Sequence, residues 1–247
     1  MKITEKLSLD INGLIEHGAI NIVIFGDSVS HGSFNGYHDY DAVYHNLLRR
    51  KLNKLRDTIP VNMINSAIGG TTAKASLMRL DRDVFSHHPD LVIVCFGLND
   101  VNGTKEEYLS SLEEIFTKCK EASDVIFLTP NMLNTYVAEG TPAQFFDYAH
   151  KTADMQNSGR MDLYMENAVK LAEEMGITVC DCYTKWKKIS ETEDTTMLLA
   201  NRINHPTKEM HKLFADALFE IFAIFRRANK YIDETMPWVL AKDESKK

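Results

Sequence analysis

The stretch Ile20-Asn21-Ile22-Val23-Ile24-Phe25-Gly26-Asp27-Ser28 decides the fold that we expect for this chain. Its apolar, β-branched run ends in a small tripeptide, a pattern typical of a buried strand that enters a tight loop. Each of the similar runs farther along lacks clean polar alternation, as expected for strands that are covered on both faces. These runs lie at residues 61–65, 91–96, 125–129 and 177–180.

Longer segments with apolar residues at helical spacing separate these runs. They lie at residues 40–56, 72–85, 105–120, 159–175 and 207–227. Five β-α repeats predict an α/β protein, a three-layer α/β/α sandwich around a five-stranded parallel sheet. We expect an N-terminal extension packed on the domain (1–19), the domain itself (20–227) and a C-terminal tail (228–247), whose aromatic residues fit either packing on the domain or a homodimer contact.

Composition and charge exclude several classes of protein. The 247 residues are 44% hydrophobic and 26% charged, which is ordinary for a globular domain. The net charge is -7 with scattered Lys and Arg, so the chain lacks the clustered basic face of a nucleic-acid-binding protein. No apolar stretch approaches the ~20 residues of a membrane span, and no secretory signal pattern opens the chain. The four cysteines have no metal or redox spacing, which favours a reduced, cytoplasmic protein without a metal site.

Ser28 is the first candidate functional residue. It follows a predicted parallel strand, and loops at the carboxyl ends of such strands face the crevice where open α/β sheets bind ligands. A serine in that place acts as a nucleophile when a base reaches it. The alternative is that Asp27 and Ser28 only cap the next helix.

Three further polar groups follow the same logic. Gly70 lies in a turn after the second strand, where paired glycines let a backbone N–H face the crevice. Asn99 follows the third strand and offers a side-chain amide donor, and His205 precedes the last helix as a candidate base. The alternatives are a plain strand-to-helix turn, an Asx turn and a surface histidine, respectively.

Taken together and in this order, the chain resembles the SGNH hydrolases, the GDSL esterase/lipase superfamily. The resemblance rests on four blocks that span residues 22 to about 220, nearly the whole domain. It implies a flavodoxin-like fold and a reaction without a metal or an organic cofactor. The blocks are Gly26-Asp27-Ser28 with its extension to Gly32, Asn65 through Thr72, Gly97-Leu98-Asn99-Asp100, and His205-Pro206.

The resemblance also implies roles for these residues. Ser28 is the nucleophile and His205 the base, while the N–H groups of Ser28 and Gly70 and the side chain of Asn99 form the oxyanion hole. The expected function is that of a serine esterase that hydrolyses small acyl esters, above all acetyl esters, of a carbohydrate or similar polar alcohol through an acyl-enzyme. The alternative is a catalytically weak carbohydrate- or ligand-binding protein that retains the fold.

The chain departs from the family at Arg202, which stands where an Asp usually orients the catalytic histidine. An arginine cannot accept the imidazole N–H, and its charge opposes the imidazolium. Three replacements are open: a backbone carbonyl near Asn201 or Arg202, a side-chain oxygen of Asn201 or Asn204, or a distant carboxylate such as Asp181 or Asp194. We favour a neutral acceptor.

Two polar loops, residues 30–39 and 130–157, follow strand ends and are expected to wall a substrate site. The expected partner is a small-molecule ester, with neither nucleic acid nor membrane. An ordinary surface excursion is the alternative for each loop. The candidate substrate-binding residues are Asp27, His31, His38, Asn131 and Arg202.

Overall fold

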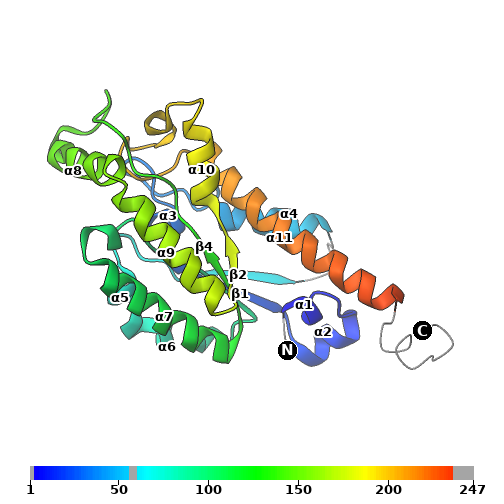
Figure 1. Cartoon of the computed structure of the whole chain (residues 1–247). Coiled ribbons are helices and arrows are strands. Elements are labelled where there is room, and N and C mark those ends of the chain that lie inside the picture. The colour runs from blue at the N-terminus through cyan, green and yellow to red at the C-terminus, as the bar shows by residue number, and fades with distance from the viewer. Residues whose placement is uncertain (1–2, 56–59, 236–247) are drawn as a thin grey trace, which may run out of the picture.

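The computed structural model describes residues 3–55 and 60–235, and a parallel sheet lies at its centre (Figure 1). The strand order β2-β1-β3-β4-β5 is the flavodoxin-like order, so the expected fold class is confirmed. The first and last residues of every strand lie within one residue of the expected ones. The strands are β1 Ile20–Gly26, β2 Val61–Asn65, β3 Leu91–Cys95, β4 Asp124–Leu128 and β5 Thr178–Cys180.

The register of β1 and β3 brings two of the expected blocks together. Ile22 lies opposite Leu91 and Gly26 opposite Cys95, so the two strands end level with each other. All five residues of β3 are buried, which explains why its sequence lacks polar alternation. The loops that carry Ser28 and Asn99 therefore leave the sheet side by side.

Helices cover both faces of the sheet (Figure 1). On one face α4 packs along the long α11, and on the other α7 packs between α5 and α9. The main helices are α4 Tyr44–Leu55, α5 Ala73–Ser76, α6 Leu80–Asp83, α7 Lys105–Ala122, α9 Arg160–Glu174 and α11 Lys208–Thr235.

Several helices depart from the expected ranges. The segment expected as one helix, 72–85, is broken into α5, a 3₁₀ turn and α6. The polar excursion 130–157 contains α8 (Phe146–Asn157), and α10 (Cys182–Ser190) follows β5. The last helix runs past the expected domain boundary at residue 228, and residues 236–247 of the expected tail lie outside the described residues.

The N-terminal residues that precede β1 contact the start of the sheet. Two short helices, α1 (Ile3–Lys6) and α2 (Ile11–His17), precede β1. The N–H of Ile3 donates to Asp124 at 2.8 Å, and Lys6 pairs with Asp90 at 2.9 Å. Both partners stand at the start of the sheet, so the extension lies at the end opposite to Ser28.

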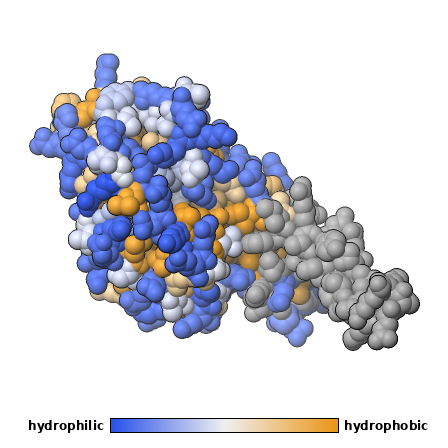
Figure 2. All heavy atoms as spheres, viewed as in Figure 1, coloured by the Kyte–Doolittle hydropathy of each residue, from blue (hydrophilic) through white to orange (hydrophobic). Residues whose placement is uncertain are grey.

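The surface view in Figure 2 shows hydrophilic residues around patches of apolar residues on one face of the molecule. None of the described helices is both long and apolar enough to cross a membrane.

Gly26 gives a first test of how tightly the end of β1 is packed. A Cβ added there would lie 2.6 Å from the carbonyl oxygen of Cys95 and 2.6 Å from the hydroxyl of Ser30. Because the first of these atoms belongs to a paired strand, Gly26→Ala is expected to lower the free energy of unfolding by about 1–3 kcal/mol in urea denaturation. Gly103→Ala, whose Cβ would meet only ordinary contacts, is the matched control. Equal stability of the two variants would contradict this packing.

Candidate active site

Ser28 stands at the first turn after the sheet, where β1 passes into the short helix α3 (Ser28–His31). The side chain of Asp27 accepts the Val29 N–H at 3.0 Å, so Asp27 is the N-cap that the sequence offered as an alternative role. Ser28 itself is 7% exposed. Its hydroxyl does not cap the helix and instead contacts a side chain from another part of the chain.

That partner is His205, which the chain brings from 177 positions away. Its Nε2 lies 3.0 Å from the Ser28 Oγ, and its Nδ1 lies 2.7 Å from the backbone carbonyl oxygen of Phe34. A carbonyl oxygen only accepts, so Nδ1 carries the proton and Nε2 carries the lone pair. In this tautomer His205 accepts from the serine hydroxyl, as a general base must.

The acceptor on Nδ1 is neutral, of the kind we favoured, but it is none of the residues expected from the sequence. Asn201 Oδ1 instead accepts the backbone N–H groups of Ile203, Asn204 and His205 at 2.9–3.0 Å, and so shapes the loop that carries the base. The Asn204 side chain accepts from Asn201. These two expectations for the orienting group are therefore wrong.

Asp181 is also wrong as an orienting group. It caps α10, where its carboxylate accepts the Thr184 N–H and the Thr129 hydroxyl, both at 3.0 Å. Asp194 accepts from Tyr136. Both carboxylates are thus engaged with other groups rather than with His205.

Arg202 turns away from the base. Its backbone adopts a left-handed conformation with φ at 61°, and its guanidinium donates to the carbonyls of Met197 and Leu199 at 2.8 Å each. The guanidinium is thus hydrogen-bonded within its own loop, and Arg202 is absent from the residues that line the pocket at Ser28. The expected contact of Arg202 with substrate is therefore not supported.

Phe34, the residue that the sequence did not reveal, is held in a small hairpin. Its N–H donates to the Tyr37 carbonyl at 2.9 Å, and Ser33 pairs with His38 across the same turn. The Phe34 ring is 1% exposed and packs on Tyr37 and on the buried His211. Asn35-Gly36 is a turn signal, but a carbonyl acceptor leaves no mark of its own in a sequence.

Three candidate donors line the same pocket as Ser28. The backbone amides of Ser28 and Gly70 donate to no acceptor among the described residues. The Asn99 amide donates to the Thr71 carbonyl at 3.0 Å and, in a long contact of 3.4 Å, to Asp27. Gly70 has a φ of 76°, which favours glycine.

These groups share one pocket of about 480 Å³. Ser28, Gly70, Asn99 and His205 all line it, and so does His38. The excursion 130–157 also contributes to the pocket, as expected of a wall of the site. The residues of this excursion that line the pocket are Pro142, Phe145 and Tyr148.

The other candidate substrate residues lie elsewhere. Asn131 is fully buried and donates to the carbonyls of Met132 and Asn204, so it braces the base loop instead of facing substrate. His31 lines a neighbouring pocket, and Asp27 is fully buried next to Ser28 in the sequence. His31 thus faces a cavity, whereas Asp27 and Asn131 are fully buried.

Burial sets the protonation of the site. Desolvation lowers the pKa of His205, and the bond to the Phe34 carbonyl offsets part of this shift. Burial also raises the pKa of Asp27 to about 7, with a further rise from the nearby Asp100. The imidazole is therefore neutral and ready to accept a proton. Within the described residues, no three His, Cys, Asp or Glu side chains are grouped so as to hold a metal ion.

Solved structures similar to this chain include esterases. A variant of Axe2, an acetyl-xylooligosaccharide esterase from Geobacillus stearothermophilus, matches with a TM-score of 0.65 and 21% identity over 81% of this chain and 93% of that one. The acetyl xylan esterase AlAXEase matches with a TM-score of 0.63 and 21% identity over 82% of this chain and 99% of that one. At these identities the likeness shows the shared fold.

Curated relatives match over short segments. The methionine–tRNA ligase of Caldanaerobacter subterraneus is 52% identical over 59 residues, and that of Clostridium acetobutylicum is 45% identical over 58 residues. These segments cover 23–24% of this chain, and the chain spans only 9% of the length of either ligase.

The family comparison covers most of the chain. The model of the GDSL-like lipase/acylhydrolase family matches residues 24–213, a range that runs from β1 into α11 and contains Ser28, Gly70, Asn99 and His205. The chain therefore belongs to the GDSL-like lipase/acylhydrolase family.

Proposed function

We propose that this protein is a serine esterase that removes acetyl or other short acyl groups from a carbohydrate or similar polar alcohol, through an acyl-enzyme on Ser28. The observation that carries the proposal is the chain of contacts from the Ser28 Oγ through the His205 ring to the Phe34 carbonyl. It supplies a nucleophile, a base in the correct tautomer and a group that fixes that tautomer.

The proposed reaction has two halves. The Ser28 Oγ attacks the ester carbonyl while its proton passes to His205 Nε2, and the negative charge on the carbonyl oxygen meets the amides of Ser28, Gly70 and Asn99. The imidazolium then gives its proton to the leaving alcohol, which departs as the acyl-enzyme forms. A water molecule repeats the sequence, losing its proton to His205, and the acid leaves as Ser28 recovers its proton.

The substrate class rests on the pocket and on the similar structures. Tyr37 and Phe145 line the pocket yet are 49% and 48% exposed, so flat aromatic surface is available beside polar groups such as Asn35 and His38. Amphipathic rings next to hydrogen-bonding side chains suit a sugar better than a long acyl chain. The esterases of similar fold act on acetylated xylan or its oligosaccharides by their descriptions, which supports acetyl transfer to water.

A ligand-binding protein without catalysis is the weaker reading. Arg202 motivated it, because the usual orienting Asp is missing. The Phe34 carbonyl, which accepts from His205, offers another orienting group. The missing Asp is therefore no longer an argument against catalysis.

Comparing acetyl and long-chain esters tests the proposed function. Purified protein is expected to hydrolyse p-nitrophenyl acetate faster than p-nitrophenyl palmitate, and to release acetate from an acetylated xylo-oligosaccharide. No hydrolysis of any of these esters would overturn the proposal. Hydrolysis confined to the long-chain ester would overturn the substrate class alone.

The pH dependence gives a sharper prediction. Because His205 must be neutral to accept a proton and burial lowers its pKa from 6.5, the acid limb of kcat/KM is expected to have its midpoint below pH 6.5. The base stays competent as the pH falls until it reaches that lowered pKa. The profile is also measured in Asp27→Asn, since the pKa of Asp27 is raised to about 7 and its ionisation falls nearby. A midpoint above 6.5 in both proteins would contradict the assignment.

A further inference from the structure

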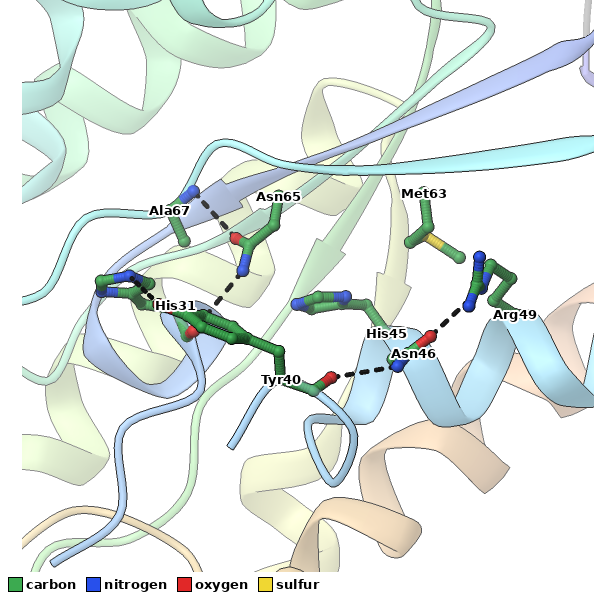
Figure 3. Close-up of a pocket in the computed structure, with 8 residues that line it drawn as sticks. All are labelled: His31, Tyr40, His45, Asn46, Arg49, Met63, Asn65 and Ala67. Carbon is green, nitrogen blue, oxygen red and sulfur yellow. Dashed lines mark hydrogen bonds between the residues drawn. The ribbon is translucent and has the colours of Figure 1, made fainter. Parts of the chain in front are cut away.

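A second pocket lies on the other side of α3, between the end of that helix, strand β2 and helix α4 (Figure 3). Its volume is about 430 Å³. His31 closes it at one end and Arg49 at the other, with Met63 and Asn65 of the edge strand forming a side (Figure 3). None of the functional roles described so far uses this pocket.

The pocket is separated from the nucleophile by little more than one side chain. His31 is the last residue of the helix that Ser28 begins. A Cβ placed on Gly69 would lie 3.6 Å from the Ser28 Cβ and 3.7 Å from the His31 Nδ1, so the Gly69 backbone passes over both. The His31 ring in turn packs against His38, which lines the pocket at Ser28. The two pockets therefore adjoin across the rings of His31 and His38.

The charged side chain that lines this pocket is the positive Arg49. No acidic side chain is among its lining residues. The Arg49 Nε donates to the Asn46 Oδ1 at 3.1 Å, but within the described residues the guanidinium forms no ion pair. Asp41, which also accepts from Asn46, is paired with Arg50 at 2.8 Å. The positive charge at this end of the pocket is thus left for a ligand.

The remaining lining is polar and able to hydrogen-bond hydroxyl groups. His45 donates from Nε2 to the Ser30 carbonyl at 3.0 Å, which leaves Nδ1 as an acceptor. Burial lowers the pKa of His45 to about 4, so this ring stays neutral. Tyr40 adds a ring that is 58% exposed and a hydroxyl in contact with His31. A ligand's hydroxyl groups can therefore donate to His45 Nδ1, and its flat apolar face can pack on the Tyr40 ring.

We propose that this pocket binds a carboxylate-bearing sugar unit, with its carboxylate on Arg49 and its hydroxyl groups along Tyr40 and His45, next to the unit whose ester lies at Ser28. The inference rests on the proposed function and deepens it, because it makes the natural substrate an acidic saccharide with at least two units. Guanidinium groups bind carboxylates in paired hydrogen bonds, which neutral sugars cannot match.

Two glycosides that differ only in the carboxylate test this pocket. Methyl β-glucuronide and methyl β-glucoside are titrated into the 247-residue chain, and binding is followed by the NMR shifts of the Ala67 and Asn65 amides, which lie at the pocket. At low salt the glucuronide is expected to bind about fivefold more tightly, a preference typical of an exposed ion pair, and added salt should reduce it. Arg49→Gln is expected to abolish the preference.

Lys51→Gln is the matched control, because it removes the same charge from the same helix at a side chain that pairs with Asp216. It should leave the preference intact. Equal affinity for the two glycosides, no binding of the glucuronide, or a preference that survives Arg49→Gln would each overturn the inference. The readout needs no turnover, so a protein that prefers the glucuronide but hydrolyses no ester keeps the subsite and overturns only the proposed function.

Discussion

Replacing Ser28 by alanine is expected to lower kcat for p-nitrophenyl acetate by at least about 10⁴-fold, because the variant has no atom that can form the acyl-enzyme. The fall is incomplete, since the amides of Gly70 and Asn99 still surround the carbonyl oxygen and can assist attack by water. The measurement is the initial rate of p-nitrophenol release by enzyme and variant at equal concentration. Thermal unfolding of both proteins checks that the fold is retained.

Ser33→Ala is the matched control. Ser33 is also buried and lines the same pocket, but its hydroxyl pairs with His38 at 3.0 Å and not with His205. Loss of one neutral hydrogen bond costs about 0.5–1.5 kcal/mol, so its kcat should change by less than about tenfold. Similar losses in Ser28→Ala and Ser33→Ala would contradict the assignment of the nucleophile.

Replacing His205 by alanine is expected to reduce kcat to a similar extent. Without the imidazole, the Ser28 hydroxyl keeps its proton and the leaving alcohol has no acid to protonate it. Because the two side chains act as a unit, the double variant of Ser28 and His205 should be no slower than either single variant. Initial rates of the two single variants and the double variant measure this non-additivity.

His150→Ala serves as the control for the loss of a histidine, since His150 is exposed on α8 and lines neither pocket. It should retain full activity. Additive losses in the double variant would mean that Ser28 and His205 act separately, and the account of the site would then be wrong.

The sheet was predictable because its signal is local. The strands β1, β3 and β4 are short apolar runs that are buried on both faces, whereas the edge strand β2 is partly exposed. The order of the motifs along the chain implied the family and its strand order. The expected clustering of Ser28, Gly70, Asn99 and His205 follows from the same topology, because parallel strands deliver their loops to one edge.

Helix α8 was not predictable from apolar spacing because the face it buries is partly polar. Thr152 donates to Asn134 at 2.6 Å, and Gln156 accepts the Leu133 N–H at 2.9 Å. These hydrogen bonds pair buried polar groups of the segment before α8 with polar side chains of the helix. The sequence of this segment therefore predicts a polar loop, because the residues that pair with its polar side chains are known only from the structure.

The break in the expected helix 72–85 has a similar origin. Arg79 turns inward, is 5% exposed, and donates to the carbonyls of Ser66 and Gly26 while its guanidinium lies 4.4 Å from the centre of the Phe25 ring. It links the loops after β1 and β2. A hydrophobicity pattern assigns such an arginine to the surface, so neither the break nor this brace was foreseen.

The orienting group was beyond sequence reasoning for another reason. Every residue has a backbone carbonyl, and only the three-dimensional structure shows that the one on Phe34 meets His205. The sequence favours a neutral acceptor, which the structure bears out, but the candidates considered were a carbonyl or a side chain near Arg202 and distant carboxylates, and not Phe34.

Reaction with a fluorophosphonate tests the central claim most directly, because the reagent forms a stable bond only with a serine that a base has activated. Intact mass and peptide mapping are expected to show one adduct per chain, on Ser28, and the adduct should form at least about 10³-fold more slowly in His205→Ala. An adduct on another residue, or equal labelling rates in the two proteins, would contradict a nucleophile at Ser28 that is activated by His205.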